Sequence, residues 1–117
     1  MTSPSTNVNQ NYAEKAPSLA EVKALEGHTI LEFGAPWCPH CQVAQEVIQQ
    51  GVIESKSQPL SHLKIYDGKG KRLGRAFKVK LWPTLVFLQN GKEISRTTRP
   101  TKISDMRELL QQAPVPK

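Results

Sequence analysis

The twelve residues ILEFGAPWCPHC, Ile30 to Cys41, contain both cysteines of this chain. The apolar and β-favouring residues that lead up to Gly34 predict a buried central strand, interrupted by one carboxylate, Glu32. Pro39 suits the first position of a helix, and the residues after it place apolar side chains on one helical face. The sequence therefore predicts that the two cysteines lie where a central strand is followed by a helix.

The spacing of Cys38 and Cys41 favours thiol–disulfide exchange. A thiol at a helix N-terminus faces unpaired backbone N–H groups and the positive end of the helix dipole, which favour the thiolate. Cys41 lies about one turn further along, so the two sulfurs can approach closely enough to bond. Cys38 would attack a substrate disulfide and Cys41 would then release the product. His40, when protonated, would stabilise the thiolate and so influence the redox potential.

Two other interpretations of the cysteines stay open at this point. A structural zinc site needs four ligands, and the chain offers Cys38, Cys41 and three histidines without a second pair at finger-like spacing, so no metal ligand is predicted. Inert core cysteines are the other interpretation, and the position between a strand and a helix argues against it. A bridge over so short a loop would stabilise little, which also disfavours a purely structural disulfide.

Helices and strands are expected to alternate along the rest of the chain. Ser18 and Glu21 form a capping box ahead of a short helix that stops at Gly27. Asn90-Gly91 predicts a tight hairpin between two β-runs. Further helices are expected over 39–51, 72–79 and 101–112, strands over 62–67, 84–89 and 92–97, and residues 52–61 fit either helix or loop. This order predicts a three-layer α/β sandwich with a mixed sheet.

A chain of 117 residues fits one domain. We expect a flexible N-terminal tail over 1–16, the domain over 17–113 and a C-terminal tail over 114–117. No window approaches the roughly 18 apolar residues of a membrane span, so no membrane partner is expected. The first residues do not resemble a secretory signal, which favours a cytoplasmic location.

The net charge of +6 is unevenly distributed along the chain. Residues 1–63 hold three Lys or Arg against six Asp or Glu, a net charge of −3, whereas residues 64–117 hold thirteen against four, a net charge of +9. A nucleic-acid surface would require interleaved aromatic residues or a recognised binding motif, and neither is present. A solvated basic face that favours acidic protein partners is the better interpretation.

Over roughly residues 18 to 112 the sequence resembles the thioredoxin family. ILEFGAPWCPHC is similar to the strand, aromatic residue and Cys-x-x-Cys helix start of thioredoxins, and LWPTLVFLQNGK, Leu81 to Lys92, to the stretch that carries their cis-proline. The resemblance implies a thioredoxin-like three-layer α/β/α sandwich with a central mixed four-stranded sheet, in the spatial order 62–67, 28–34, 84–89, 92–97. It also implies that Cys38 is the nucleophile and Cys41 the resolving thiol.

The resemblance implies roles for five more residues. Pro83 would be the cis-proline beside the disulfide, Trp82 would offer its backbone to an extended substrate, and Trp37 would complete the substrate-binding surface. Glu32 stands where thioredoxins carry a buried aspartate that handles the proton of the resolving cysteine, and Lys64 where they carry a lysine near that acid. Each has a simpler alternative: Glu32 turned to solvent, Lys64 on the surface, Trp82 as a hydrophobic anchor.

The expected activity is reduction of protein disulfides by a monomer, with electrons from a reductase and no cofactor beyond the Cys38–Cys41 pair. The Pro39-His40 dipeptide differs from the Gly-Pro of ordinary thioredoxins and is similar to that of periplasmic thiol oxidases of the DsbA type. Oxidation or isomerisation of disulfides is therefore an alternative, and a non-catalytic binding module is another. His28 and His62 flank strands and are expected at the surface or in capping positions.

Overall fold

The computed structural model describes residues 16–55 and 60–111. Its elements follow in the order α1 (Leu19–Lys23), β1 (His28–Gly34), α2 (Pro39–Glu54), β2 (Leu60–Tyr66), α3 (Arg72–Ala76), β3 (Thr84–Gln89), β4 (Lys92–Thr98) and α4 (Ile103–Leu110). The predicted tails lie outside these residues, apart from Ala16, which packs against the core.

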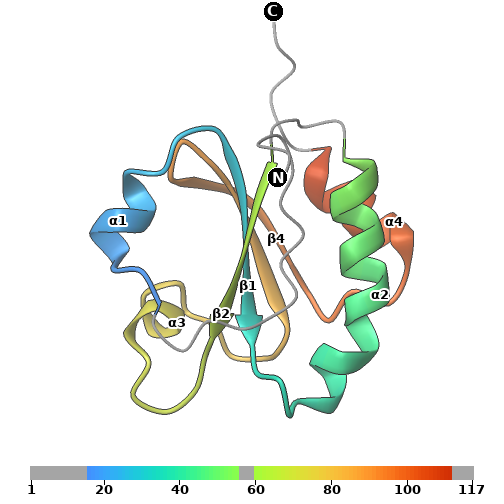
Figure 1. The fold of residues 1–117 in the computed structure, drawn as a ribbon, viewed down its shortest axis with the longest axis horizontal. Helices are drawn as coiled ribbons and strands as arrows, with labels where there is room; N and C mark the ends of the chain where they lie inside the picture. The colour runs from blue at the N-terminus through green and yellow to red at the C-terminus, as the bar shows by residue number, and fades with distance from the viewer. Residues whose placement is uncertain (1–15, 56–59, 112–117) are drawn as a thin grey trace, which may run out of the picture.

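The four strands form one mixed sheet in the order β2-β1-β3-β4. β1 runs parallel to β2 and antiparallel to β3, and β4 completes the hairpin with β3. Helices α2 and α4 lie on one face of the sheet, and α1 and α3 lie on the other (Figure 1). The expected fold class and strand order are therefore confirmed.

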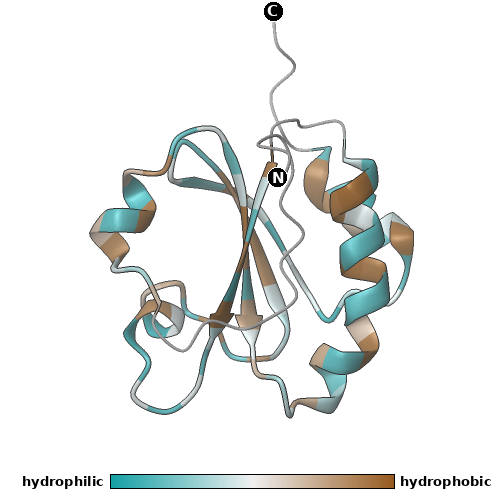
Figure 2. Ribbon diagram, in the orientation of Figure 1, coloured by the Kyte–Doolittle hydropathy of each residue, from teal (hydrophilic) through white to brown (hydrophobic). Residues whose placement is uncertain are grey.

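An apolar core covers each face of the sheet. Because both faces of β1 and β3 are buried, most of the side chains of these strands are apolar. One core lies under α2 and α4 and includes Ile30, Ala44, Ile48, Val52, Leu85, Phe87 and Met106. The other lies under α1 and α3 and includes Val22, Leu31, Phe33, Leu73, Val86 and Leu88. Figure 2 shows the apolar strands between helices whose hydropathy alternates along their length. Gly51 lets α2 approach α4, because a Cβ there would lie 2.6 Å from the Cβ of Met106.

Several element boundaries differ from those that the sequence predicts. The ambiguous stretch divides: residues 52–54 continue α2 and residues 60–61 begin β2, while 56–59 lie outside the described residues. α3 ends at Ala76, because Lys78 adopts a left-handed backbone with φ of 57° that a helix does not tolerate. The capping box of Ser18 and Glu21 is present at the start of α1.

In the part of the chain that the structure describes, every helix is too short or too polar to cross a membrane.

Candidate active site

The end of β1 and the start of α2 place the two cysteines. Cys38 is the N-cap residue of α2 with Pro39 at the first helical position, and its Sγ accepts a hydrogen bond from the backbone N–H of Cys41 at 3.3 Å. Both cysteines are free thiols, with 5% of Cys38 and 1% of Cys41 exposed. The Cys38 sulfur thus lies where helix N–H groups stabilise a thiolate.

An aromatic rim borders the thiols. Trp37, 61% exposed, meets Trp82 edge to face with ring centroids 5.4 Å apart. The Trp37 indole N–H donates to the Tyr66 hydroxyl at 3.0 Å, and the Trp82 indole N–H donates to Asp67 Oδ2 at 2.9 Å. Trp82 and Tyr66 pack against the cysteine pair, so this rim forms one continuous surface with the site.

Tyr66 and Asp67 are site residues that the sequence analysis missed. Tyr66 ends β2 and Asp67 follows it, and β2 runs parallel to β1 in a register that pairs Tyr66 with Gly34. The carboxyl ends of parallel neighbours meet at one sheet edge, and this rule was the available signal.

The segment before β3 lies at the same edge of the sheet. The Trp82–Pro83 peptide bond is cis, and Thr84, which follows it, pairs with Phe33 of β1. Arg99 binds this segment twice: its Nε donates to the Trp82 carbonyl oxygen at 2.8 Å, and its backbone N–H donates to the Pro83 carbonyl oxygen at 2.8 Å. Arg99 is a further residue without a sequence signal, because its contact depends on the turn after β4.

Polar side chains form a buried cluster beneath the cysteines. Glu32 and His62 have fully buried side chains, with Glu32 Oε1 and His62 Nε2 2.7 Å apart. Gln45 Nε2 donates to Glu32 Oε2 at 2.8 Å and to the Cys41 carbonyl oxygen at 2.9 Å. Lys64 Nζ donates to Gln45 Oε1 at 2.6 Å. Glu32 and Lys64 are thus inside the molecule rather than turned to solvent.

Burial is the main influence on the charge of Lys64 in this cluster. Burial lowers the pKa of Lys64 below its ordinary value, and the negative charges of Glu32 and Cys41 oppose this shift. An ammonium group in this position is accommodated because Gln45 links it to the Glu32 carboxylate.

The expectation that His62 lies at the surface or in a capping position is wrong. Its side chain is fully buried against Glu32, because residues 60, 62 and 64 of β2 point to the same face, towards α2. That alternation was the signal in the sequence. His28 is partly buried at the start of β1 and packs its ring beside Phe87, with centroids 5.5 Å apart.

His40 is exposed in the first turn of α2, two residues from Cys38. The structure therefore brings all eight candidate residues to one region: Cys38, Cys41, Glu32, His40, Lys64, Trp37, Trp82 and Pro83. Among the described residues, no group of three or more His, Cys, Asp or Glu side chains is placed to hold a metal ion.

Comparison with known proteins is consistent across sequence and structure. The Thioredoxin family model matches residues 9–112. The reduced form of thioredoxin 2 from Pseudomonas aeruginosa PAO1 is 41% identical, with a TM-score of 0.77 over 91% of this chain and 100% of that chain.

Protein disulfide-isomerases are also similar. The barley protein (Hordeum vulgare) is 34% identical over 69% of this chain, and the rabbit protein (Oryctolagus cuniculus) is 30% identical over 69%. The matched parts make up only 17% and 16% of those proteins. With a family match over most of its length and a free Cys-x-x-Cys pair at the start of α2, this chain belongs to the thioredoxin family.

Proposed function

We propose that this protein is a thiol–disulfide oxidoreductase of thioredoxin type that reduces protein disulfides. The observation that carries the proposal is the cysteine pair itself: two free thiols at the start of α2, with the Cys38 sulfur bound by the N–H of Cys41. A thiolate held in this way is the attacking species in disulfide exchange.

The reaction proceeds in two exchanges. The Cys38 thiolate attacks one sulfur of the substrate disulfide, a mixed disulfide forms, and the other substrate sulfur leaves as a thiolate. Cys41 then loses its proton and attacks the Cys38 sulfur, so that the Cys38–Cys41 disulfide forms and the second substrate thiolate leaves. Two electrons pass to the substrate, and a separate reductase returns them to the protein.

The rim residues Trp37, Trp82 and Pro83 are proposed to bind the substrate chain. Trp37 is exposed and Leu81 is half-exposed beside the cis bond, so apolar side chains are available next to a nearly buried sulfur. An extended polypeptide that covers this rim would bring its disulfide to Cys38.

Insulin reduction tests the proposed function directly. The wild-type protein, kept reduced by dithiothreitol, is expected to precipitate the insulin B chain faster than dithiothreitol alone, and Cys38→Ser is expected to remove this acceleration. A Cys38→Ser variant as active as wild type would contradict the proposed role of Cys38. A wild-type protein no faster than dithiothreitol alone would contradict the proposal and favour a non-catalytic binding module.

A second candidate function is oxidation or isomerisation of disulfides. It is favoured by His40, which is exposed two residues from Cys38 and can add a positive charge near the thiolate when protonated. Equilibration with glutathione buffers decides between the two directions. A reduction potential close to that of cytosolic reductants, and unchanged in His40→Pro, would support the reductase; a strongly oxidising potential that His40→Pro lowers would support the oxidase.

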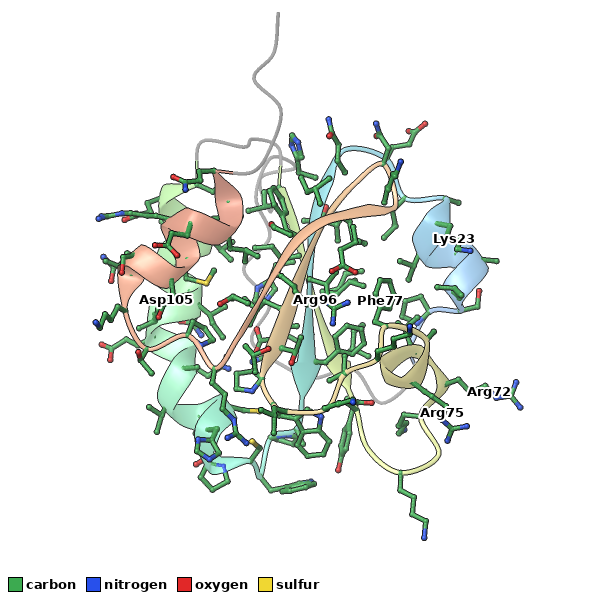
Figure 3. The ribbon with its side chains drawn as sticks, turned by 180° about the vertical axis from the view of Figure 1, so that it is seen from behind. Lys23, Arg72, Arg75, Phe77, Arg96 and Asp105 are labelled. Carbon is green, nitrogen blue, oxygen red and sulfur yellow. The ribbon has the colours of Figure 1, made fainter. Side chains whose placement is uncertain are left out.

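We also propose that the partners are acidic polypeptides. Residues 68–80 contain six Lys or Arg and no Asp or Glu. Figure 3 shows Arg72 and Arg75 pointing away from the molecule on α3. Lys71 connects this segment to the site, because its Nζ lies 5.3 Å from the centre of the Tyr66 ring, which contacts Trp37. Acidic residues near a substrate disulfide would therefore meet positive charge.

A monomeric state and a cytoplasmic location complete the proposal. The only cysteines form the reactive pair, which is typical of a chain in a reducing compartment. Sedimentation of the reduced protein and fractionation of cells that produce it test these two points, with a dimer or an exported protein as the contrary results.

A further inference from the structure

A buried histidine shares a hydrogen bond with the acid beneath the resolving cysteine, and the inference from it rests on the proposed exchange activity. The Glu32 and His62 side chains are both fully buried, and 2.7 Å separates Oε1 from Nε2. A carboxylate without water is strongly destabilised unless its oxygens are hydrogen-bonded. The second oxygen of Glu32 is bound by Gln45, so both oxygens have a partner.

The register of the sheet brings His62 to this position. β1 and β2 are parallel neighbours that pair Ile30 with His62 and Glu32 with Lys64. The side chains of Glu32, His62 and Lys64 therefore lie on the face of the sheet that α2 covers, where Gln45 meets them.

The hydrogen bonds of Gln45 limit where protons lie in this cluster. Its Oε1 accepts from Lys64, which has only donors, so its Nε2 is the group that donates to Glu32 and to the Cys41 carbonyl. Glu32 Oε2 is then an acceptor. A carboxyl proton, when present, belongs on Oε1, in the short contact with His62 Nε2.

We propose that His62 is a positioning residue for proton transfer from Cys41, and that Glu32 and His62 accept this proton as a pair. Before transfer, the neutral imidazole donates its Nε2–H to the carboxylate and keeps it ionised in an apolar interior. When Cys41 forms its thiolate, the S–H bond breaks and the pair gains one proton, so its net charge changes from −1 to 0. Without His62, burial favours a protonated Glu32 that has no capacity to accept it.

Two other titratable groups act on this cluster: Lys64 on β2 interacts with the charges of Glu32 and of Cys41 on α2. The apolar core under α2 and α4, which includes Ala44, Ile48, Leu85 and Met106, covers the same face of the sheet. Lys64 also favours an ionised Glu32 through Gln45, so the test leaves Lys64 and Gln45 unchanged.

The test follows the two exchanges separately. Reduced protein is mixed in stopped flow with an equimolar amount of the aromatic disulfide dithionitrobenzoate. Attack by Cys38 releases the first coloured thiolate and attack by Cys41 releases the second, and both phases are recorded between about pH 5 and pH 9. His62→Leu removes the hydrogen bond, and His62→Gln keeps an N–H donor of similar size that cannot carry the proton.

We expect the second phase of His62→Leu to be about tenfold slower at pH 7, with its rise displaced to higher pH, and the first phase to be unchanged. His62→Gln is expected to show a smaller displacement in the same direction. A second phase with the wild-type pH profile in either variant would overturn the proposal, and His62→Gln preserves this test if His62→Leu does not fold.

His28→Leu is the matched control, since His28 stands at the opposite end of the same parallel pair. It is expected to keep both wild-type phases, and a displacement equal to that of His62→Leu would overturn the specific role. The two proposals fail differently: absence of both phases in the wild-type protein contradicts the exchange activity, whereas normal phases with unshifted His62 variants contradict only the role of His62.

Discussion

The two cysteines differ in their surroundings, and the difference sets their order in the reaction. Cys38 is at the helix N-cap behind an exposed tryptophan, whereas Cys41 is almost fully covered. Cys41 lies next to the buried side chains of Glu32, His62 and Lys64 and the partly buried Gln45. A substrate disulfide therefore reaches Cys38 first.

Cys41→Ser is expected to trap the mixed disulfide. Without the resolving thiol, Cys38 still attacks, and the product remains covalently attached. Mass spectrometry after mixing with one equivalent of a disulfide peptide should show a stable adduct in Cys41→Ser and none in Cys38→Ser. An adduct in the latter variant would mean that Cys41 attacks first.

Lys64 should make stability depend on alkaline pH. Because burial lowers the pKa of Lys64 from 10.5, the unfolded chain binds more protons than the folded chain between the two pKa values. The free energy of unfolding contributed by this group therefore rises as pH increases through that window.

Urea unfolding of reduced wild type and Lys64→Met, at several pH values between about 8 and 10, measures the contribution of Lys64 to the free energy of unfolding. The wild-type value minus the variant value should increase with pH. A difference that falls with pH would contradict the buried position of Lys64.

At the scale of the elements, α3 packs closely against Asp67, the residue that binds the Trp82 indole. Gly74 is buried in α3, and a Cβ there would overlap the Asp67 carboxylate, which holds the Trp82 indole. The glycine thus lets a short helix pack against the side chain that orients the rim.

Gly74→Ala is expected to destabilise the fold by about 1–3 kcal/mol and to displace Trp82 through Asp67. We expect insulin reduction to slow more than reaction with dithionitrobenzoate, which does not need the rim. Ala76→Ser, on the exposed side of the same helix, is the control and should leave both rates unchanged; equal loss on both substrates in Gly74→Ala would contradict the link.

The start of α4 depends on Asp105. Its Oδ2 accepts backbone N–H bonds from Thr101 at 2.9 Å and Lys102 at 3.1 Å, and these bonds lower the pKa of the Asp105 carboxyl. A lowered pKa means that this stabilisation is complete above the ordinary pKa and is lost as pH falls through the folded value.

Asp105→Ala should lower the free energy of unfolding by about 0.5–2 kcal/mol at pH 7, with the difference shrinking in acid. Denaturant unfolding at neutral and acid pH measures it. Glu108→Ala, one turn later and exposed, should have little effect. An Asp105→Ala variant as stable as wild type at pH 7 would show that the two hydrogen bonds of Asp105 contribute nothing to stability.

The sequence patterns that predict this fold depend on interactions between residues close together in the chain. The capping box at Ser18, the hairpin at Asn90-Gly91 and the cysteine spacing all act within a few residues, and each appears in the structure. The end of α3 was not predictable in this way, because it depends on the left-handed backbone of Lys78.

The site was predicted for residues next to the cysteines or matched by family resemblance, and not for those brought in by tertiary contacts. Asp67, Gln45 and Arg99 are ordinary polar residues in sequence, and their partners lie far along the chain. A lone histidine near a strand end is expected at the surface or in a capping position, because the sequence does not show that the Glu32 carboxylate lies beside His62 on the neighbouring strand.

At the scale of the whole molecule, basic residues lie both near the thiols and at the opposite end of the sheet. Arg72 and Arg75 lie on α3, which Asp67 and Lys71 connect to the thiol edge. Lys92 lies at the opposite edge, where it pairs with Gln89, and Lys23 contacts the same hairpin through its backbone at Gly91.

The double variant Arg72→Glu/Arg75→Glu should lose about three- to tenfold in kcat/KM on a disulfide peptide with acidic flanks at low salt, and less at high salt. Lys23→Glu/Lys92→Glu carries the same charge change at the other edge and should retain wild-type rates. If both double variants lose equally, net charge rather than the basic segment explains the preference.

Both tryptophans of the chain lie at the cysteine pair, 5.4 Å apart between ring centroids. All the intrinsic tryptophan fluorescence of this protein therefore comes from the site of the two thiols. A change of emission on oxidation, or when a peptide covers the rim, reports directly on the site, so the redox titration and the docking of substrates can be followed on the unlabelled protein.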